Sequence, residues 1–406
     1  MSAESIRNAV RTHLDGAQAF LCDLLRFPST SGKETEAMDF VAERCASLGA
    51  VEKVPLSNEL LSDPDYSSPI PDLTYDGRHN VRVTREGGGG RSLIFNTHLD
   101  VVPPSEGMAD PWAGRVEDGT VYGRGACDAK GQAAAAFLML NALNDVGHAG
   151  DVTVHFVVEE ENGGNGTLAM VRGDDRADGC IVLEPTDGTV FTSIRGAVWF
   201  RLTLRGRAGH SGQAGETKSA LLMARDAIGI LEKYHAGLLA ASRGFELFDP
   251  YPNPMPLTVG QLNAGNWPAS APSEAVLEGV LGFLPNKTGK QVAAEMKRAL
   301  TDGALAEGSF ELVMTYRHDC SVLDPEHDLP QGLLAAGKAA GTPLEIGAMT
   351  ASCDAWFYNN ILGIPTVVYG PGTLKVAHSK DESIQMVQVA AAAEALAGFV
   401  LDWGGK

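Results

Sequence analysis

The residues best suited to chemistry are histidines and carboxylates that come after apolar segments of the chain. Those that directly follow such a segment are His98, Asp100, Glu159, Glu160, Glu161 and Glu184. Asp128 lies in a glycine-rich segment just before a helix-like stretch, and His378 lies in the loop after another apolar segment. Polar groups beyond the carboxyl ends of strands meet at one edge of an open α/β sheet. We therefore expect these side chains to converge there.

Imidazoles and carboxylates gathered at one edge suit a borderline divalent metal such as zinc, cobalt or manganese. The expected ligands are His98, Asp128, Glu160, Glu184 and His378. Their three carboxylates would leave a net charge of -1 beside one divalent ion. Two ions bridged by Asp128 and a hydroxide would leave no net charge, so we expect two ions about 3.5 Å apart.

Each motif also has an ordinary structural interpretation. A histidine two residues before an aspartate is common at protein surfaces, and a run of three glutamates is usually a solvated face. His210, which is followed by Ser211 and Gly212, would by default be a loop histidine. The glutamate run favours function because it directly follows an almost continuously apolar segment, Val152 to Val158.

The elements that would position these residues follow a strand–helix–strand order between residues 80 and 190. The expected strands are 92–96, 152–158 and 180–183, with helices at 129–143 and 165–171. The same pattern returns near the end of the chain, with a strand at 365–369 and a helix from about Glu382. This order predicts an α/β sheet covered by helices.

Between residues 193 and 318 the pattern becomes that of a small α+β domain. The expected order is strand, helix, strand, strand, helix, strand, at 197–204, 221–234, 257–262, 275–283, 290–300 and 310–316. This order is typical of a ferredoxin-like domain. We predict a catalytic α/β domain of residues 1–192 and 319–406, with a mixed, mostly parallel sheet, and an inserted domain of residues 193–318.

Composition narrows the classes of function. The 406 residues, 44% of them hydrophobic, are enough for two domains. The net charge of -19 disfavours a nucleic-acid partner. The six cysteines lack zinc-type spacing and read as reduced thiols. With neither a signal peptide nor a membrane-length apolar run in the sequence, we expect a cytoplasmic protein.

Six short segments carry a resemblance to a known family. They are Thr97–Pro103, Gly123–Gly131, Glu159–Glu160, Leu183–Thr186, Gly209–Ser211 and Ala377–Ser379. In this order they resemble the co-catalytic aminoacylase family, which includes acetylornithine deacetylase, succinyl-diaminopimelate desuccinylase and carboxypeptidase G. The resemblance covers nearly the whole chain, and the His-x-Asp and Gly-Arg-Gly-x-x-Asp motifs together are highly specific.

The resemblance implies a metal centre with two ions. One ion would be held by His98, Asp128 and Glu184. The other would be held by Asp128, Glu160 and His378, so that Asp128 bridges the two. The peptide bond that follows Asp128 is often cis in this family.

The resemblance also implies catalytic roles. Glu159 would be the general base that deprotonates the bridging water, and Asp100 would orient His98. The inserted domain would be a dimerisation lid, from which His210 reaches the partner chain's site and stabilises the tetrahedral oxyanion. Because side chains alternate along a strand, Glu159 and Glu160 should point in different directions, one to the substrate and one to metal.

The chain departs from the family where many relatives place an arginine that grips a substrate carboxylate. That stretch is Gly279–Pro285 and contains no arginine. The candidate substitutes are Arg195, Asn266, Arg317 and the Gly370–Gly372 backbone.

The main prediction is a homodimeric metallohydrolase, with zinc as the expected metal, that cleaves an amide bond in a small N-acyl amino acid or dipeptide-like substrate. An alternative keeps the metals but hydrolyses a carbamoyl or aryl-amine bond. A nucleotide-dependent oxidoreductase would use Gly163–Gly166, but the spacing misses G-x-G-x-x-G and the preceding glutamates repel a pyrophosphate. A non-catalytic dimeric binding protein would be expected to have lost Glu159 or a metal ligand, and this chain keeps all of them.

Overall fold

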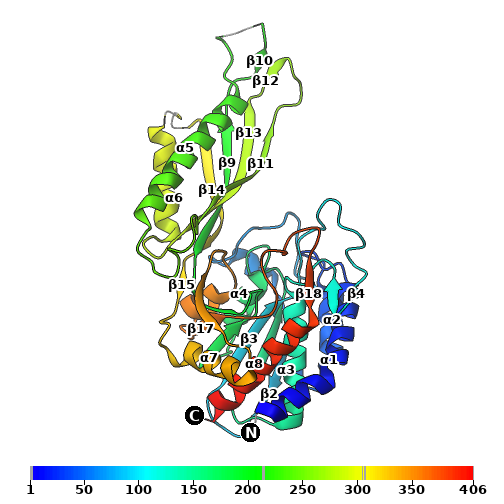
Figure 1. The fold of residues 1–406 in the computed structure, drawn as a ribbon. Helices are drawn as coiled ribbons and strands as arrows, with labels where there is room; N and C mark the ends of the chain where they lie inside the picture. The colour runs from blue at the N-terminus through cyan, green and yellow to red at the C-terminus, as the bar shows by residue number, and fades with distance from the viewer. Residues whose placement is uncertain (1–2, 213–214, 304, 306–307, 406) are drawn as a thin grey trace. The chain divides into compact units, whose positions relative to one another are not determined.

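The computed structural model describes residues 3–212, 215–303, 305 and 308–405, which form two compact units (Figure 1). The first unit comprises Met1–Ser193, Val322–Gly347 and Cys353–Lys406. The second comprises Ile194–Ser321 and Ala348–Ser352.

A mixed sheet forms the centre of the first unit, in the order β1-β2-β6-β3-β7-β17-β8-β15, with β16 paired to β8. The strands are β1 Ala50–Pro55, β2 His79–Arg85, β3 Leu93–His98, β6 Val152–Val157, β7 Gly179–Val182, β8 Thr189–Ile194, β15 Ser321–Val322, β16 Glu345–Met349 and β17 Thr366–Val368. Strand β3 is parallel to β6 and to β7, and β17 is parallel to β7. The predicted α/β fold is confirmed, and its parallel centre brings the carboxyl ends of these strands to one edge.

Helices α1, α3, α7 and α8 pack on one another in this unit (Figure 1). The helices are α1 Ala3–Leu25, α2 Thr35–Arg44, α3 Lys130–Val146, α4 Asn165–Val171, α7 Asp328–Ala340 and α8 Met386–Gly404, with short turns η1 Asn58–Ser62 and η2 Phe357–Ile361. By length and composition alone, α8 could cross a membrane. Its buried side chains and its contacts with α1, α3 and α7 are those of a core helix.

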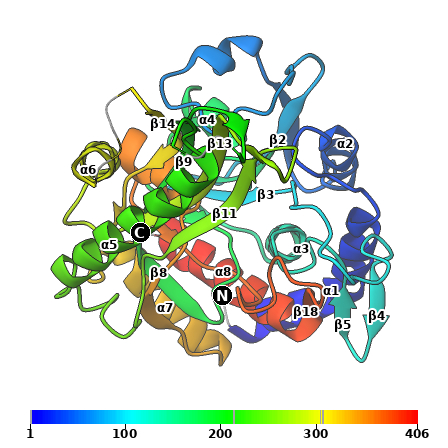
Figure 2. The same cartoon turned by 90° about the horizontal axis from the view of Figure 1, so that it is seen from above.

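A small sheet in the order β18-β5-β4 lies beside α1 in the first unit (Figure 2). Its strands are β4 Arg115–Glu117, β5 Thr120–Tyr122 and β18 Ser383–Gln385. Because β18 pairs with β5, the last helix begins at Met386 and not near Glu382, as the sequence pattern had predicted.

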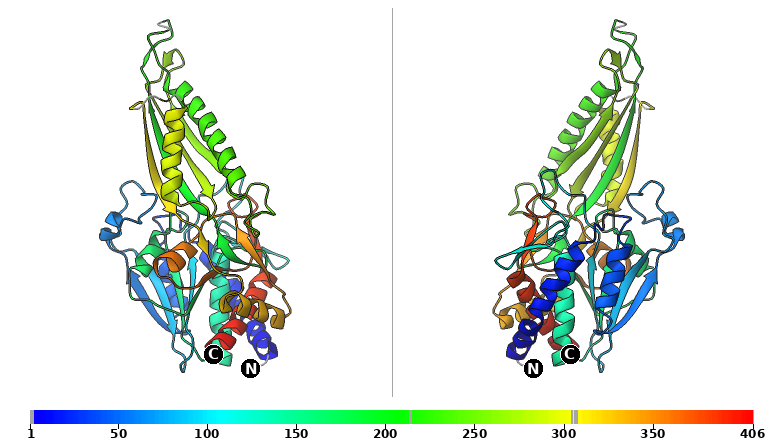
Figure 3. Two further views of the ribbon diagram at one scale, coloured as in Figure 1. Left: turned by 90° about the vertical axis from the view of Figure 1, so that its left-hand side faces the viewer. Right: turned by 90° about the vertical axis from the view of Figure 1, so that its right-hand side faces the viewer.

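The second unit is a four-stranded antiparallel sheet, in the order β11-β13-β9-β14, with α5 and α6 on one face (Figure 3). Its elements are β9 Gly196–Arg205, α5 Ala220–Ala241, β11 Leu257–Ala264, β13 Glu274–Phe283, α6 Gly289–Asp302 and β14 Phe310–His318, with β10 Gly209–His210 paired to β12 Ser270–Ala271. The alternating apolar residues of β9, from Val198 to Leu204, face the core beneath the helices. The expected order of strands and helices is therefore observed.

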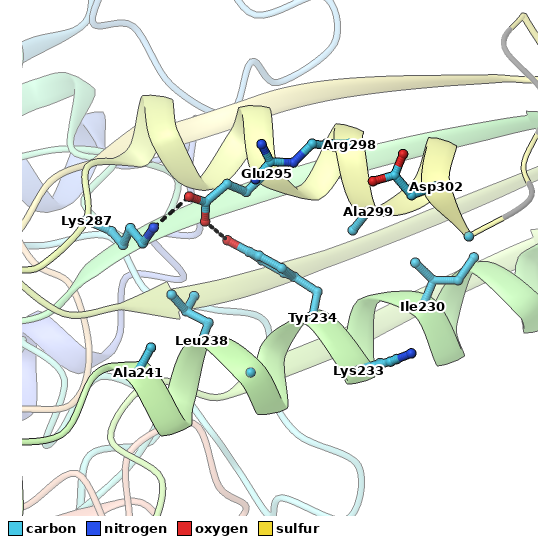
Figure 4. A pocket seen from close by; sticks show the side chains of 12 residues that line it. Ile230, Lys233, Tyr234, Leu238, Ala241, Lys287, Glu295, Arg298, Ala299 and Asp302 are labelled. Carbon is cyan, nitrogen blue, oxygen red and sulfur yellow. Dashed lines mark hydrogen bonds and ion pairs between the residues drawn. The ribbon is translucent and has the colours of Figure 1, made fainter.

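A groove of about 630 Å³ lies between α5 and α6 (Figure 4). At one end, Glu295 accepts hydrogen bonds from Tyr234 Oη at 2.9 Å and Lys287 Nζ at 2.6 Å. No residue predicted to do chemistry lines this groove. The residues predicted to do chemistry lie instead mainly at the sheet edge of the first unit.

Candidate metal centre

Three neighbouring strands deliver side chains to the same edge of the central sheet. His98 is the last residue of β3, the glutamate run follows the end of β6, and Glu184 follows the end of β7. Asp128 comes just before Ala129, the N-cap residue of α3. The expected convergence beyond the strand ends is therefore present.

Two groups of potential ligands lie at this edge. The first is His98, Glu160 and Glu184, and the second is Asp128, Glu161 and His378. Within each group the ligand atoms lie within 4.8 Å of one another. Asp128 joins the groups, because its Oδ1 is 3.1 Å from His98 Nε2 and its Oδ2 is 3.2 Å from His378 Nε2. A carboxylate placed between two imidazoles has the geometry of a bridging ligand.

The protonation of these groups fits a site built for cations. Burial raises the pKa of Glu160 and Glu184 well above the usual value, and His98 opposes this. Repulsion from neighbouring carboxylates adds to the rise, chiefly from Glu184 at Glu160 and from Asp128 at Glu184. Hydrogen bonds to Asp128 and Glu161 raise the pKa of His378 to about 10. Without other cations the cluster therefore holds protons. Divalent ions would displace those protons and balance the buried carboxylates, so the donor set fits such ions.

The structure does not bring Glu159 to either group. Its buried carboxylate accepts hydrogen bonds from Arg78 Nη1 at 2.5 Å, Tyr75 Oη at 2.8 Å and Asn165 Nδ2 at 3.0 Å. All three donors lie outside both groups of potential ligands. The geometry therefore departs from the assignment of Glu159 as the general base.

The next two glutamates each join one group of potential ligands. Glu160 Oε2 lies 4.0 Å from His98 Nε2, in the first group, and Glu161 Oε1 lies 2.9 Å from His378 Nε2, in the second. Glu161, not Glu160, therefore lies beside His378; Glu161 was expected at this edge but was not assigned as a ligand. Strand alternation failed to predict this because β6 ends at Val157 and the backbone then turns.

Asp100 supports the site in two ways. Its backbone carbonyl lies 2.9 Å from His98 Nδ1, closer than its carboxylate at 3.4 Å, so the ring N–H donates to the carbonyl. The carboxylate accepts the backbone N–H groups of Glu160 and Glu161, each at 3.0 Å. Asp100 therefore turns His98 Nε2 toward Asp128 and also holds the glutamate turn.

Glu382 is a buried residue that sequence reasoning missed at the site. Its carboxylate accepts the backbone N–H groups of Gly125, Cys127 and Asp128, and it pairs with Arg124. These bonds hold the segment that presents Asp128, whose bond to Ala129 is cis as expected. No motif pointed to this role, because Glu382 stood at the start of an expected helix.

His210 lies in the second unit, exposed on β10. Its Nδ1 accepts the backbone N–H of Gly212 at 3.1 Å. The neutral ring then carries its proton on Nε2, which is the tautomer needed to donate to an oxyanion.

The four candidates for gripping a substrate carboxylate differ in exposure. Arg195 is buried and donates to the carbonyls of Thr350 and Gly196. Asn266 and Arg317 are exposed. In the fourth candidate, the N–H and carbonyl of Gly370 bond to the Thr186 hydroxyl. The assignment of a carboxylate clamp stays a prediction.

The chain is similar in sequence to a known protein family and to proteins of known activity. Residues 94–402 match the profile of Peptidase family M20/M25/M40. The succinyl-diaminopimelate desuccinylase of Methylocella silvestris is 32% identical over 307 residues, which are 70% of this chain and 72% of that protein.

Two solved structures share the fold. The dipeptidase Dug1p of Saccharomyces cerevisiae has a TM-score of 0.82 at 14% identity, covering 100% of this chain and 99% of that one. The YXEP protein of Bacillus subtilis, described as a dinuclear metal binding peptidase, has a TM-score of 0.64 at 15% identity, covering 97% and 99% of the two chains.

Proposed function

Because the chain belongs to Peptidase family M20/M25/M40, whose relatives hydrolyse amide bonds, we propose that it uses two divalent ions to cleave the amide bond of a small N-acyl amino acid or dipeptide-like substrate. The observation that carries this proposal is the position of Asp128, which contacts one imidazole from each group of potential ligands. The relatives support an amide substrate, since one is named a desuccinylase and one a dipeptidase.

The proposed ligands follow from sharing Asp128 between the two groups. The first ion is held by His98, Glu184 and Asp128, and the second by Asp128, Glu161 and His378. Each ion then has three protein ligands, the number typical of catalytic zinc sites. When bound, the ions polarise the substrate carbonyl and lower the pKa of a water molecule.

Glu160 is the proposed general base. It lies among the ligands but is not needed to complete either set of three. Its carboxylate takes the proton of the attacking water and returns it to the leaving amine. Asp100 keeps Glu160 in place through the backbone N–H of that residue.

Four further features belong to the proposal. The metal is zinc, with cobalt or manganese as alternatives. The protein is a cytoplasmic homodimer, and residues 193–318 serve as a dimerisation lid. His210 donates its Nε2–H to the oxyanion in the partner's site, which its tautomer supports.

A hydrolysis screen tests the proposed function. Chelator-treated protein is supplied with zinc, cobalt or manganese and offered N-acyl amino acids, dipeptides, N-carbamoyl amino acids and aryl amides. We expect metal-dependent release of an amine from the first two classes. Turnover confined to the carbamoyl or aryl substrates would replace the proposed substrate. Full activity in strong chelator would refute the proposed chemistry.

A further inference from the structure

A buried network lies directly behind the turn of residues 159–161. The Glu159 side chain is 0% exposed and accepts three hydrogen bonds, from Arg78, Tyr75 and Asn165. A buried carboxylate that accepts several hydrogen bonds, one of them from a guanidinium, is held firmly in one position. Glu159 is therefore fixed to the protein interior while its neighbours face the ligand groups.

Arg78 pairs with a second buried carboxylate. Its Nη2 donates to Glu34 Oε2 at 2.8 Å, and Glu34 Oε1 accepts the backbone N–H of Gly32 at 2.8 Å. Glu34 stands at the start of α2, whereas Glu159 follows β6. Arg78 thus has two carboxylate partners in similar environments, and only one of them belongs to the 159–161 turn.

The backbone of this turn needs external support. Glu159 has a φ of +59°, in the left-handed region that side chains other than glycine disfavour. The turn lets the N–H groups of both Glu160 and Glu161 donate to Asp100. Asp100 therefore holds the turn by its backbone, while Arg78 holds it by the Glu159 side chain.

We propose that Glu159 is a positioning residue whose ion pair with Arg78 fixes the left-handed turn and so sets the direction of the Glu160 carboxylate. This inference rests on the proposed function, in which Glu160 is the general base. Glu159 acts only through its neighbour, because among the described residues its carboxylate bonds to Tyr75, Arg78 and Asn165, none of which belongs to either ligand group. A misplacement of about 1 Å at a reacting group can cost on the order of a hundredfold in rate.

Three variants separate positioning from stability. Glu159→Gln should lower kcat by roughly ten- to a hundredfold and change KM by less than about twofold, because the turn is loosened but substrate contacts stay. Glu159→Asp keeps a carboxylate for Arg78 and tolerates the left-handed backbone, so its kcat should stay within about threefold of wild type. Glu34→Gln is the matched control, and its kcat should stay within about twofold, because Arg78 still pairs with Glu159.

Thermal unfolding and crystal structures of the variants complete the test. Glu34→Gln and Glu159→Gln each remove one carboxylate from Arg78, so both should lower Tm by similar amounts. Only Glu159→Gln should move residue 159 out of the left-handed region and shift the Glu160 carboxylate.

An unmoved Glu160 in Glu159→Gln, or equal losses of kcat in Glu34→Gln and Glu159→Gln, would overturn the positioning role. A wild-type protein without metal-dependent hydrolysis would instead refute the proposed function. The crystal structures would still decide whether Glu159 holds the turn.

Discussion

Glu160 and Glu161 are adjacent in the chain but lie in different groups of potential ligands, and this difference predicts opposite effects of the same substitution. Glu160→Gln should keep two ions per chain and lower kcat by about 10²–10⁴, the range expected for loss of a general base. Glu161→Gln should lose the ion that His378 helps to hold. Elemental analysis and steady-state kinetics on both variants measure the two effects.

Glu326→Gln is a suitable control for both variants, because Glu326 is exposed and belongs to neither ligand group. It should match wild type in metal content and in kcat. If Glu160→Gln loses metal while Glu161→Gln keeps it, the two roles are reversed.

At the residue scale, the sequence predicted that histidines and carboxylates meet at the sheet edge. It did not predict which of the three glutamates at 159–161 lies in which group of potential ligands. His98, Asp128, Glu184 and His378 lie where strand ends and motifs placed them. The alternation argument assumed that the strand continues through the glutamates. The direction of each carboxylate instead depends on the left-handed backbone at Glu159, which is held by residues distant in sequence.

At the element scale, the N-terminus of α6 offers a test of local stability in the second unit. Thr288 forms a capping box with Gln291. Thr288→Ala removes a cap worth about 1 kcal/mol, so it should lower the stability of this unit. Thr301→Ala is the control, because Thr301 is exposed in the last turn of the same helix. Denaturant unfolding followed by circular dichroism should show a loss for Thr288→Ala only.

Long periodic elements could be predicted from the sequence, whereas short pairing strands could not. Helix α5 and the strands of the second unit follow directly from apolar periodicity. Strand β18 has only three residues and exists because it pairs with β5, more than 250 residues earlier. Short sequences carry little periodic signal, so tertiary pairing decided where the last helix begins.

At the scale of the whole molecule, the proposed role of His210 in the partner's site predicts complementation between inactive variants. His210→Ala should lose about 3 kcal/mol of oxyanion stabilisation, roughly a hundredfold in rate, and keep its metal. A dimer of one His210→Ala chain and one Glu160→Gln chain has one intact site. Random exchange makes about half the dimers mixed, so roughly a quarter of wild-type activity should return.

Each variant incubated alone is the control for this experiment and should stay inactive. A lack of recovery despite proven subunit exchange would rule out action across a dimer. A monomer with full activity would do the same.

The central claim is that one chain binds two divalent ions through a shared Asp128, and the most direct measurement is the metal stoichiometry. Native mass spectrometry of chelator-treated protein reconstituted with zinc should show two ions per chain in wild type. His98→Ala and His378→Ala should each lose one of the two ions, because each removes a ligand from a different group. Wild-type protein that binds no zinc, or only one ion per chain at saturation, would contradict the account.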